Sequence, residues 1–432
     1  PYTTLFRSYS TMHTTGQSYL MSFQASGPHA ADRALEAIVF GYQELTRYPD
    51  RFTWEKTVAG QPVKLEKFGT NIPKGLALSI GCGTFPTWNT VPGLYASLVT
   101  GNSVIVKPHP NSIYPIAIVV AHIQQVLKEN GFDPNLVLLA CDSKKELIAK
   151  ELAMDPAVKI IDFTGSTAFG NWVESLPGKI TFTEKSGVNS IIIDSFDDLD
   201  SMVKNIAFSL CLYSGQMCTT PQNIFIPKRG VKSEGKTVPF EEVEKALVEA
   251  VKGLAGHPKI GHVLLGAIQS EKTLERLDNL KRSGSKILLE STPVNNPEFP
   301  EVRGRGPLML EVASGDKNTW EQELFGPISI IIPTENTDES LELAASCSST
   351  KGAISCGAYS TDPETIKKIA TKMAEAATPV SFNLTGNIYV NQNAGFSDFH
   401  VTGGNPSGNA SFTNSEFVLK RFTRVQSRVN LS

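Results

Sequence analysis

The stretch LALSI at Leu76–Ile80 begins the part of the sequence that decides the fold. Apolar runs of this kind, without alternating polar residues, are typical of parallel strands buried on both faces. Residues 112–130 combine a capping serine, apolar residues at helical spacing and a following Gly131, and so predict a helix. The alternation predicts βαβ units in an open parallel sheet. Further apolar runs lie at 104–106, 136–139 and 159–163.

A second series of the same kind follows Glu184. A chain of 432 residues exceeds what one core usually supports, so two α/β domains are expected, at residues 9–187 and 188–410, with a cleft between them. The polar connection 228–237 is expected to be a surface loop. In the second domain, strands are expected at 191–193, 223–226 and 328–332, and helices near 199–212, 240–254 and 271–282.

Composition and charge exclude several classes of protein. The formal net charge of −3 argues against a nucleic-acid binder, which would concentrate Lys and Arg. The longest apolar run, Ile113–Val120, is too short to cross a membrane. Six cysteines without zinc-ribbon or disulfide-scaffold spacing favour a reducing, cytoplasmic location and predict no metal site. The first residues, Pro1–Ser8, resemble a translated sequencing adaptor, so we expect a scar and a missing natural N-terminus.

Two features at predicted strand ends could hold a phosphate-bearing ligand. The segment FTGSTAFG, at Phe163–Gly170, leaves a buried strand and opens a helix whose first N–H groups suit a pyrophosphate, although a plain strand-to-helix turn would also need small residues. Lys107 ends the strand at 104–106, where its ammonium could contact a ribose or phosphate or simply be solvated.

Three residues could share one covalent reaction. Cys218, in SGQMC at 214–218, sits at a predicted loop tip, where its thiol needs an electropositive setting or a nearby base. Glu184, in TEKSG at 183–187, could be that base or could activate water. Asn89, in FPTWN at 85–89, could stabilise an oxyanion together with the Cys218 N–H, or could only form a turn. The other five cysteines are interpreted as buried small hydrophobic residues.

These segments, with ELFGP at 323–327, resemble the aldehyde dehydrogenase superfamily from Leu65 to the C-terminus. The resemblance implies two Rossmann-like domains, the first binding the cofactor and the second catalytic. It also implies NAD(P)-dependent oxidation of an aldehyde through a thiohemiacetal and a thioester on Cys218, with Asn89 and the Cys218 amide at the oxyanion and Glu184 activating water. The implied cofactor residues are Trp88, Lys107, Gly165, Ser166, Glu323 and Phe325.

Finer features are similar to the phenylacetic acid degradation (PaaN-type) branch, which implies oxidation of a semialdehyde derived from an aromatic CoA thioester. They are CGTFPTWN at 82–89, KPHP at 107–110 and FSDFH at 396–400. NAD-preferring relatives carry a glutamate where this chain has Pro110, so NADP is expected as the cofactor, with NAD as the alternative. Tyr213, Phe396 and Phe399 are candidates for the walls of the substrate tunnel.

The resemblance also implies assembly. A hairpin near Phe52–Thr70 is expected to pair with the strand Phe417–Val425 of a neighbouring subunit, giving a dimer or a dimer of dimers, so residues 411–432 are assigned to a C-terminal oligomerisation strand and tail. Two other functions remain open. One is a CoA-acylating aldehyde dehydrogenase; the other is an inactive truncated fold or a binding and assembly protein.

Overall fold

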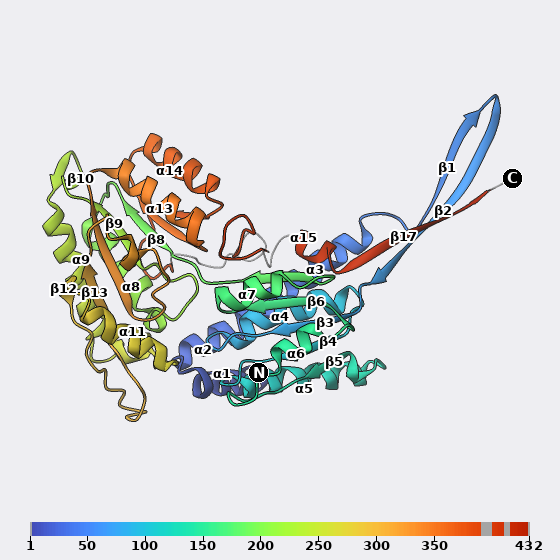
Figure 1. Ribbon diagram of the computed structural model, residues 1–432, viewed down its shortest axis with the longest axis horizontal. Helices are drawn as coiled ribbons and strands as arrows, with labels where there is room; N and C mark the ends of the chain where they lie inside the picture. The colour runs from blue at the N-terminus through green and yellow to red at the C-terminus, as the bar shows by residue number, and fades with distance from the viewer. Residues whose placement is uncertain (1, 390–399, 410–414, 431–432) are drawn as a thin grey trace.

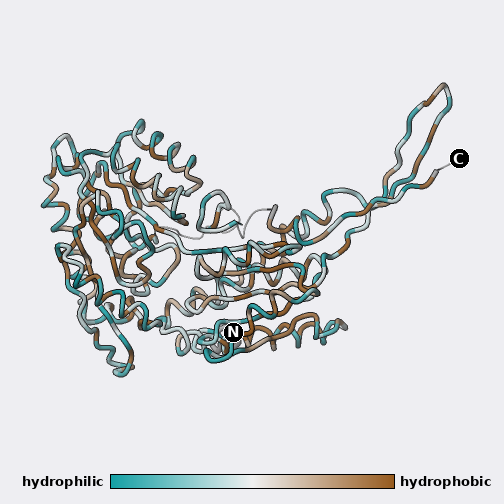
Figure 2. The backbone as a smooth tube through the Cα atoms, in the orientation of Figure 1, coloured by the Kyte–Doolittle hydropathy of each residue, from teal (hydrophilic) through white to brown (hydrophobic). Residues whose placement is uncertain are grey.

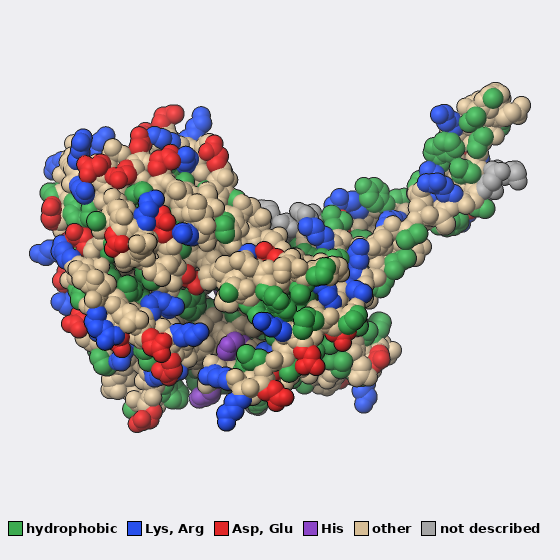
Figure 3. Space-filling model, in the orientation of Figure 1, with side chains coloured by type: hydrophobic (Ala, Val, Ile, Leu, Met, Phe, Trp, Pro, Cys, Tyr) green, Lys and Arg blue, Asp and Glu red, His purple; other side chains and the backbone are tan. Residues whose placement is uncertain are grey.

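The computed structural model describes residues 2–389, 400–409 and 415–430. It has two lobes, each built on its own sheet, and an arm that projects away from both (Figure 1). Figure 3 shows the notch between the lobes and the full length of the arm. The fold is therefore of the predicted α/β class, with two open sheets.

The first lobe contains a five-stranded parallel sheet in the order β5-β4-β3-β6-β7. The chain runs outward from β3 in one direction and from β6 in the other, so the strand order reverses between them, where open α/β sheets bind ligands. The strands are β3 (Leu76–Ile80), β4 (Val104–Lys107), β5 (Val137–Leu139), β6 (Val158–Thr164) and β7 (Ile180–Glu184). The accompanying helices are α4 (Pro86–Val99), α5 (Ile113–Glu129), η1 (Pro134–Leu136), α6 (Ala149–Met154) and α7 (Thr167–Glu174).

The second lobe contains a seven-stranded sheet in the order β12-β13-β14-β9-β8-β15-β16, in which only β12 is antiparallel to its neighbour. Its strands are β8 (Ser190–Ile193), β9 (Asn223–Pro227), β12 (Lys286–Leu289), β13 (Leu308–Glu311), β14 (Ile328–Thr334), β15 (Cys356–Tyr359) and β16 (Val380–Phe382). Its helices are α8 (Leu199–Cys211), η2 (Leu212–Gly215), α9 (Phe240–Ala255), α10 (Gly261–Leu265), α11 (Glu271–Lys281), α12 (Lys317–Trp320), α13 (Thr337–Lys351) and α14 (Pro363–Glu375).

The arm is a three-stranded antiparallel sheet in the order β1-β2-β17. It consists of β1 (Arg51–Val58), β2 (Gln61–Pro73) and β17 (Phe422–Asn430), so the predicted hairpin is present. Before it come α1 (Tyr2–Thr15), α2 (Tyr19–Ser26) and α3 (Pro28–Thr46), and the helix α15 (Ser415–Leu419) precedes β17. Residues 2–8, expected to be a scar, form the start of α1.

Three expectations about these segments need correction. The tail strand begins at Phe422 rather than at Phe417, because the adjacent residues Phe417 and Val418 are both buried, which a helical turn allows and an alternating strand does not. That strand pairs along one edge with β2 of its own chain, which the sequence analysis did not expect, and its pairing with a neighbouring subunit stays a prediction. The connection 228–237 contains a small hairpin of β10 (Val231–Ser233) and β11 (Lys236–Val238).

Hydrophobic residues concentrate along the strands and the inner helix faces of both lobes (Figure 2). The second-lobe strand β14 is buried along its whole length, as its predominantly apolar sequence predicts. No helix in the described part of the chain is both long and apolar enough to span a membrane.

Candidate active site

Cys218 follows a tightly turned loop at the end of α8. Tyr213, Ser214 and Gly215 all have positive φ, at 52°, 52° and 63°. Two non-glycine residues in succession with left-handed backbone are costly and persist only where the surroundings hold them. Here the Tyr213 hydroxyl donates to the Thr15 carbonyl across 2.6 Å, which ties the loop to the N-terminal helices.

Further side chains fix the loop on either side of Cys218. The Gln216 amide donates to the Ala267 carbonyl across 2.8 Å and accepts from the Gln269 N–H across 2.9 Å. Asn189 donates to the Cys218 carbonyl across 2.7 Å. The backbone around Cys218, the predicted nucleophile, is therefore fixed by hydrogen bonds to Asn189 and to the segment 267–269.

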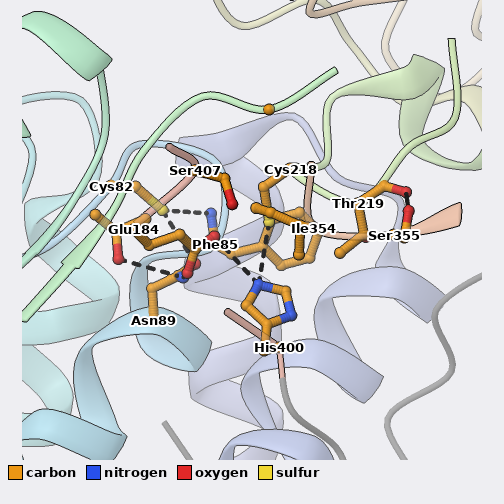
Figure 4. A network of polar contacts seen from close by, with 12 residues as sticks. Cys82, Phe85, Asn89, Glu184, Cys218, Thr219, Ile354, Ser355, His400 and Ser407 are labelled. Atoms are coloured by element: carbon orange, nitrogen blue, oxygen red, sulfur yellow. Dashed lines mark hydrogen bonds and ion pairs between the residues drawn. The ribbon is translucent and has the colours of Figure 1, made fainter. Parts of the chain in front are cut away.

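Glu184 is the last residue of β7 and is buried, with 1% of its surface exposed. It stands where the chain leaves the first sheet for the second, so its carboxylate faces the segment that carries Cys218 (Figure 4). Burial alone would raise the pKa of this carboxyl. The charge and hydrogen bond of His400, a hydrogen bond with Cys218 and the nearby Arg33 oppose it, and the net effect lowers the pKa below its ordinary value.

Asn89 lies in the second turn of α4, the helix that follows β3. Its Nδ2 donates to Glu184 Oε2 across 3.2 Å and contacts Thr164 Oγ1 at 3.5 Å. Its Oδ1 accepts from the Cys82 thiol across 3.2 Å, which fixes the orientation of the amide. The structure therefore brings Asn89 and Glu184 into direct contact, and Asn89 lines the same cavity as Cys218.

His400 is a site residue that the sequence analysis did not select. Its Nε2 lies 3.4 Å from Cys218 Sγ and 3.2 Å from Glu184 Oε1, and its ring meets the Trp88 ring edge-on, with centroids 4.7 Å apart. The thiol, imidazole and carboxylate atoms all lie within 4.8 Å of one another. Only the FSDFH segment at 396–400 pointed to this region, because nothing in local spacing connects His400 with a cysteine 182 residues away.

The surroundings keep the Cys218 thiol protonated in the resting protein. Burial is the largest cause, and the negative charge of Glu184 adds to it, so the pKa of the thiol is raised well above its ordinary value. The thiol therefore has a base nearby, but its surroundings do not stabilise the thiolate by positive charge. A reaction at sulfur must move the proton as the new bond forms.

Cys218 lies where two cavities meet. The first has a volume of about 130 Å³ and a largely apolar wall. The second has a wall rich in backbone and glycine, with one aromatic and one acidic side chain. Besides Cys218, the first is lined by Met21, Gln24, Ala25, His29, Phe85, Trp88, Asn89, Leu212, Met217, Thr219, Tyr389 and His400. The second is lined by Gly187, Asn189, Gly215, Met217, Thr220, Gln222, Glu323, Leu324, Phe325, Gly326 and Ile328.

Residues 29–427 match the model of the aldehyde dehydrogenase family. The chain belongs to the aldehyde dehydrogenase family. Members of this family are oxidoreductases that use NAD or NADP.

Several known proteins are similar to this chain. A crystal structure of an NAD-dependent aldehyde dehydrogenase from Burkholderia multivorans is 46% identical, with a TM-score of 0.95, and the match covers 99% of this chain and 77% of that one. The 4-trimethylaminobutyraldehyde dehydrogenase B of Danio rerio is 23% identical over 306 residues, which are 67% of this chain and 55% of that enzyme. A structure of 1-pyrroline-5-carboxylate dehydrogenase shares the fold, with a TM-score of 0.76 at 17% identity, and the match covers 98% of this chain and 77% of that one.

The second cavity, about 10 Å³ in volume, is the candidate site for the nicotinamide end of the dinucleotide that aldehyde dehydrogenases use. It reaches Cys218, and two of the predicted cofactor residues, Glu323 and Phe325, lie in its wall. Glu323 is held in place by the Gly187 N–H, which donates to Oε1 across 3.4 Å. Glycines at 187, 215 and 326 contribute backbone to the wall of this cavity.

The other predicted cofactor residues lie elsewhere. Gly165 and Ser166 form the β6–α7 turn, where Ser166 Oγ accepts from the Phe169 N–H across 3.5 Å and caps the helix. Trp88 lines the first cavity, beside His400. The Lys107 ammonium is buried and paired with Asp142 Oδ2 across 2.7 Å.

The predicted tunnel residues are only partly placed. Tyr213 is buried next to Phe85, with ring centroids 5.6 Å apart, and it lines neither of the two cavities at Cys218. It supports the wall and does not form it. Phe396 and Phe399 lie outside the described residues. The expected absence of a metal stays a prediction.

Proposed function

We propose that this chain oxidises an aldehyde to the carboxylic acid through a thioester on Cys218, with NAD(P)⁺ as the oxidant. The observation that carries the proposal is the position of Cys218 at the junction of two cavities, with Asn89 and Glu184 paired beside it. The whole activity is a proposal because the chain spans only part of the relatives it matches, 77% of one and 55% of another.

Each residue has a separate task. The Cys218 sulfur attacks the aldehyde carbon, and the Asn89 N–H donates to the oxygen as that oxygen becomes negative. When bound, the nicotinamide supplies the acceptor for the hydride that leaves this carbon. Glu184, whose lowered pKa keeps it ionised, then takes a proton from the water that cleaves the thioester.

Turnover assays test this directly. Purified protein mixed with aldehyde and either cofactor should form reduced cofactor and an equal amount of carboxylic acid, measured by absorbance and by mass spectrometry. Cys218→Ala should abolish both products, whereas Cys141→Ser, at an exposed cysteine outside both cavities, should leave the rates unchanged. An active Cys218→Ala variant would exclude the mechanism.

The substrate is proposed to be an aldehyde with an apolar body, consistent with a semialdehyde from aromatic or phenylacetate catabolism. Support comes from the first cavity, where Phe85, Trp88 and Tyr389 surround the approach to Cys218. A panel of short aliphatic, aromatic and CoA-linked semialdehydes checks the proposal through kcat/KM. A preference for the smallest polar aldehydes would contradict it.

Release by water is favoured over release by CoA. Glu184 supports this preference because water needs a general base, whereas the thiol of CoA is a better nucleophile. Assays with aldehyde and cofactor, with and without CoA, separate the alternatives. Strict dependence on CoA would establish the acylating enzyme, and the absence of all turnover with retained cofactor binding would support a binding protein or an inactive fragment.

The preference for NAD or NADP depends on whether a carboxylate lies close enough to Lys107 to repel the 2′-phosphate of NADP. The sequence favoured NADP because no acidic residue closely follows Lys107. Asp142, from the loop after β5, lies 2.7 Å from the Lys107 ammonium, so a carboxylate stands beside that lysine after all. It would repel a 2′-phosphate, and we therefore propose that NAD is used at least as well as NADP. A kcat/KM clearly higher with NADP would contradict this.

Assembly through the arm stays a proposal. Phe52, Trp54 and Val58 on β1 are large exposed hydrophobic side chains on a thin projecting sheet, and β1 is one edge of that sheet. We expect a homodimer or a dimer of dimers in which the arm is covered. Light scattering of the unmodified chain and of a Trp54→Lys variant tests this proposal, because the variant should have the smaller molar mass in solution. The same molar mass for the two proteins would contradict a role for this edge.

A further inference from the structure

We propose that His400 is a catalytic residue that accepts the proton of Cys218 as its sulfur attacks. This role rests on the function proposed above and extends it. The single nitrogen Nε2 lies 3.4 Å from Cys218 Sγ and 3.2 Å from Glu184 Oε1 (Figure 4). The imidazole therefore stands between the sulfur that must lose a proton and a carboxylate that can stabilise the resulting positive charge.

The neighbouring contacts favour His400 over Glu184 for this first step. Glu184 also hydrogen-bonds with the Cys218 thiol, but its Oε2 accepts from Asn89 and its Oε1 lies 3.2 Å from His400 Nε2, so the thiol shares a carboxylate that two other groups already contact. A thiol buried beside a negative charge does not ionise unaided, so a neutral base within direct reach is needed. A neutral histidine within hydrogen-bond reach of a thiol is a recognised base for activating a cysteine nucleophile.

The step balances as follows. The S–C bond forms at the aldehyde carbon, the carbonyl π pair moves to oxygen beside the Asn89 N–H, and the thiol proton passes to Nε2. Nε2 accepts in the tautomer that carries its first proton on Nδ1. The new imidazolium then donates to Glu184 Oε1, and the proton returns to sulfur when the S–C bond of the thioester breaks.

The groups around His400 come from several elements. Glu184 ends β7, Cys218 follows η2 and the uncharged Trp88 ring lies on α4. Arg33 of α3 lies over the Trp88 ring, 4.7 Å from its centroid, and acts on Glu184. Near the sulfur, Cys82 and Glu323 both disfavour the thiolate. Within these described surroundings, Glu184 is the negative group in contact with the imidazole.

The test is alkylation of Cys218 by iodoacetamide, which needs neither aldehyde nor cofactor. Sulfur forms a bond to carbon, iodide leaves and the proton again passes to the base, so His400 should act here as well. The rate at each cysteine is read by mass spectrometry, with the exposed Cys141 as the internal reference. The variants are His400→Gln, His400→Ala with and without added imidazole, and His122→Gln on the exposed face of α5 as the control.

In His400→Gln the rate at Cys218 relative to Cys141 should fall at least about tenfold at neutral pH and approach the unmodified rate at high pH, where hydroxide removes the proton. Added imidazole should restore the alkylation rate at Cys218 in His400→Ala. In His122→Gln this rate should equal that of the unmodified protein. An unchanged ratio at neutral pH would overturn the proposal. A deficit that persists at every pH and resists imidazole would also overturn it, since it would indicate a structural role.

A measurement on the unmodified chain covers the case in which the variants do not fold. Alkylation in deuterium oxide should slow at Cys218 more than at Cys141, because a proton moves in the rate-limiting step only where a base assists. Equal isotope effects at the two cysteines would reject the role of His400. This alkylation requires no aldehyde. A larger isotope effect at Cys218 than at Cys141, combined with an absence of turnover, would therefore contradict the proposed dehydrogenase activity but not the proposed role of His400.

Discussion

The amide of Asn89 donates to Glu184 Oε2 across 3.2 Å, so the proposed oxyanion donor and the proposed water-activating base are hydrogen-bonded in the free protein. An aldehyde oxygen that binds Asn89 must compete with that carboxylate. Aldehyde binding would then break the hydrogen bond from Asn89 to Glu184 and free Glu184 Oε2 to accept a proton in the later hydrolytic step.

Removing this donor should weaken attack on the aldehyde. Asn89→Ala should lower kcat/KM by roughly 10²-fold, the usual effect of losing one donor to a developing oxyanion. Thr164→Val, which removes only the longer 3.5 Å contact to the same amide, should cost much less. Steady-state kinetics measure both, and equal losses would place the important interaction at Thr164.

Glu184→Gln should separate the two halves of the reaction. Hydride transfer should still occur once for each active site, because attack by sulfur does not require Glu184 to accept a proton from water. Hydrolysis should then slow by about 10²- to 10⁴-fold. Stopped-flow absorbance should record a burst of reduced cofactor followed by a slow phase, and loss of the burst itself would contradict this division of roles.

Acid should remove the stabilising effect of the Glu184 charge. The folded-state pKa of this carboxyl lies below its ordinary value of 4.5, so its contribution to stability is present above that value and is lost as the pH falls through the folded-state pKa. Glu184→Gln should therefore be less stable than the unmodified chain at pH 7, with a difference that shrinks on acidification. Urea unfolding at several pH values measures it, and a gap that widens below pH 4.5 would have the wrong sign.

The loop before Cys218 should not tolerate a side chain at Gly215. A Cβ there would lie 2.2 Å from the Gly326 carbonyl oxygen, in addition to the cost of its φ of 63°. Gly235 is a matched control, since its φ is 78° but a Cβ would meet no atom within 4 Å. Thermal unfolding should show a loss of about 1 kcal/mol for Gly235→Ala and clearly more, above ~3 kcal/mol, for Gly215→Ala. Similar losses of stability in the two variants would mean that the backbone moves to relieve the contact between the new Cβ at residue 215 and the Gly326 carbonyl.

Asp142 should control the response to the 2′-phosphate. Asp142→Asn removes the negative charge beside Lys107 and should raise the ratio of kcat/KM for NADP to that for NAD by on the order of tenfold. Asp278→Asn, on the exposed face of α11, is the control and should leave the ratio unchanged. A fall in the ratio for Asp142→Asn would place the phosphate away from this pair.

The framework could be predicted from the sequence because its strands are buried on both faces and therefore appear as unbroken apolar runs. Strands β3 and β9 begin where the runs at 76–80 and 223–226 predict them, and α5 lies within the range 112–130 predicted for it. Buried parallel strands leave a strong local signal. The placement of Cys218, Glu184 and Asn89 at one site follows from motifs at the ends of these elements.

The remaining features depend on contacts between distant segments. His400 reaches Cys218 from a segment 182 residues away, and Asp142 meets Lys107 from a loop after a different strand. Neither pairing leaves a periodic signal in the sequence. The intrachain position of β17 likewise depends on how α15 is packed, since burial of Phe417 and Val418 sets where the strand begins.

Trapping the acyl group tests the central claim most directly. Glu184→Gln protein mixed with aldehyde and NAD or NADP, quenched in acid and digested, should carry one acyl group on the peptide that contains Cys218, in a ratio of one to the reduced cofactor formed. The same experiment with Cys218→Ser in addition should give neither product. Reduced cofactor without a Cys218 adduct, or an adduct on another residue, would contradict the account.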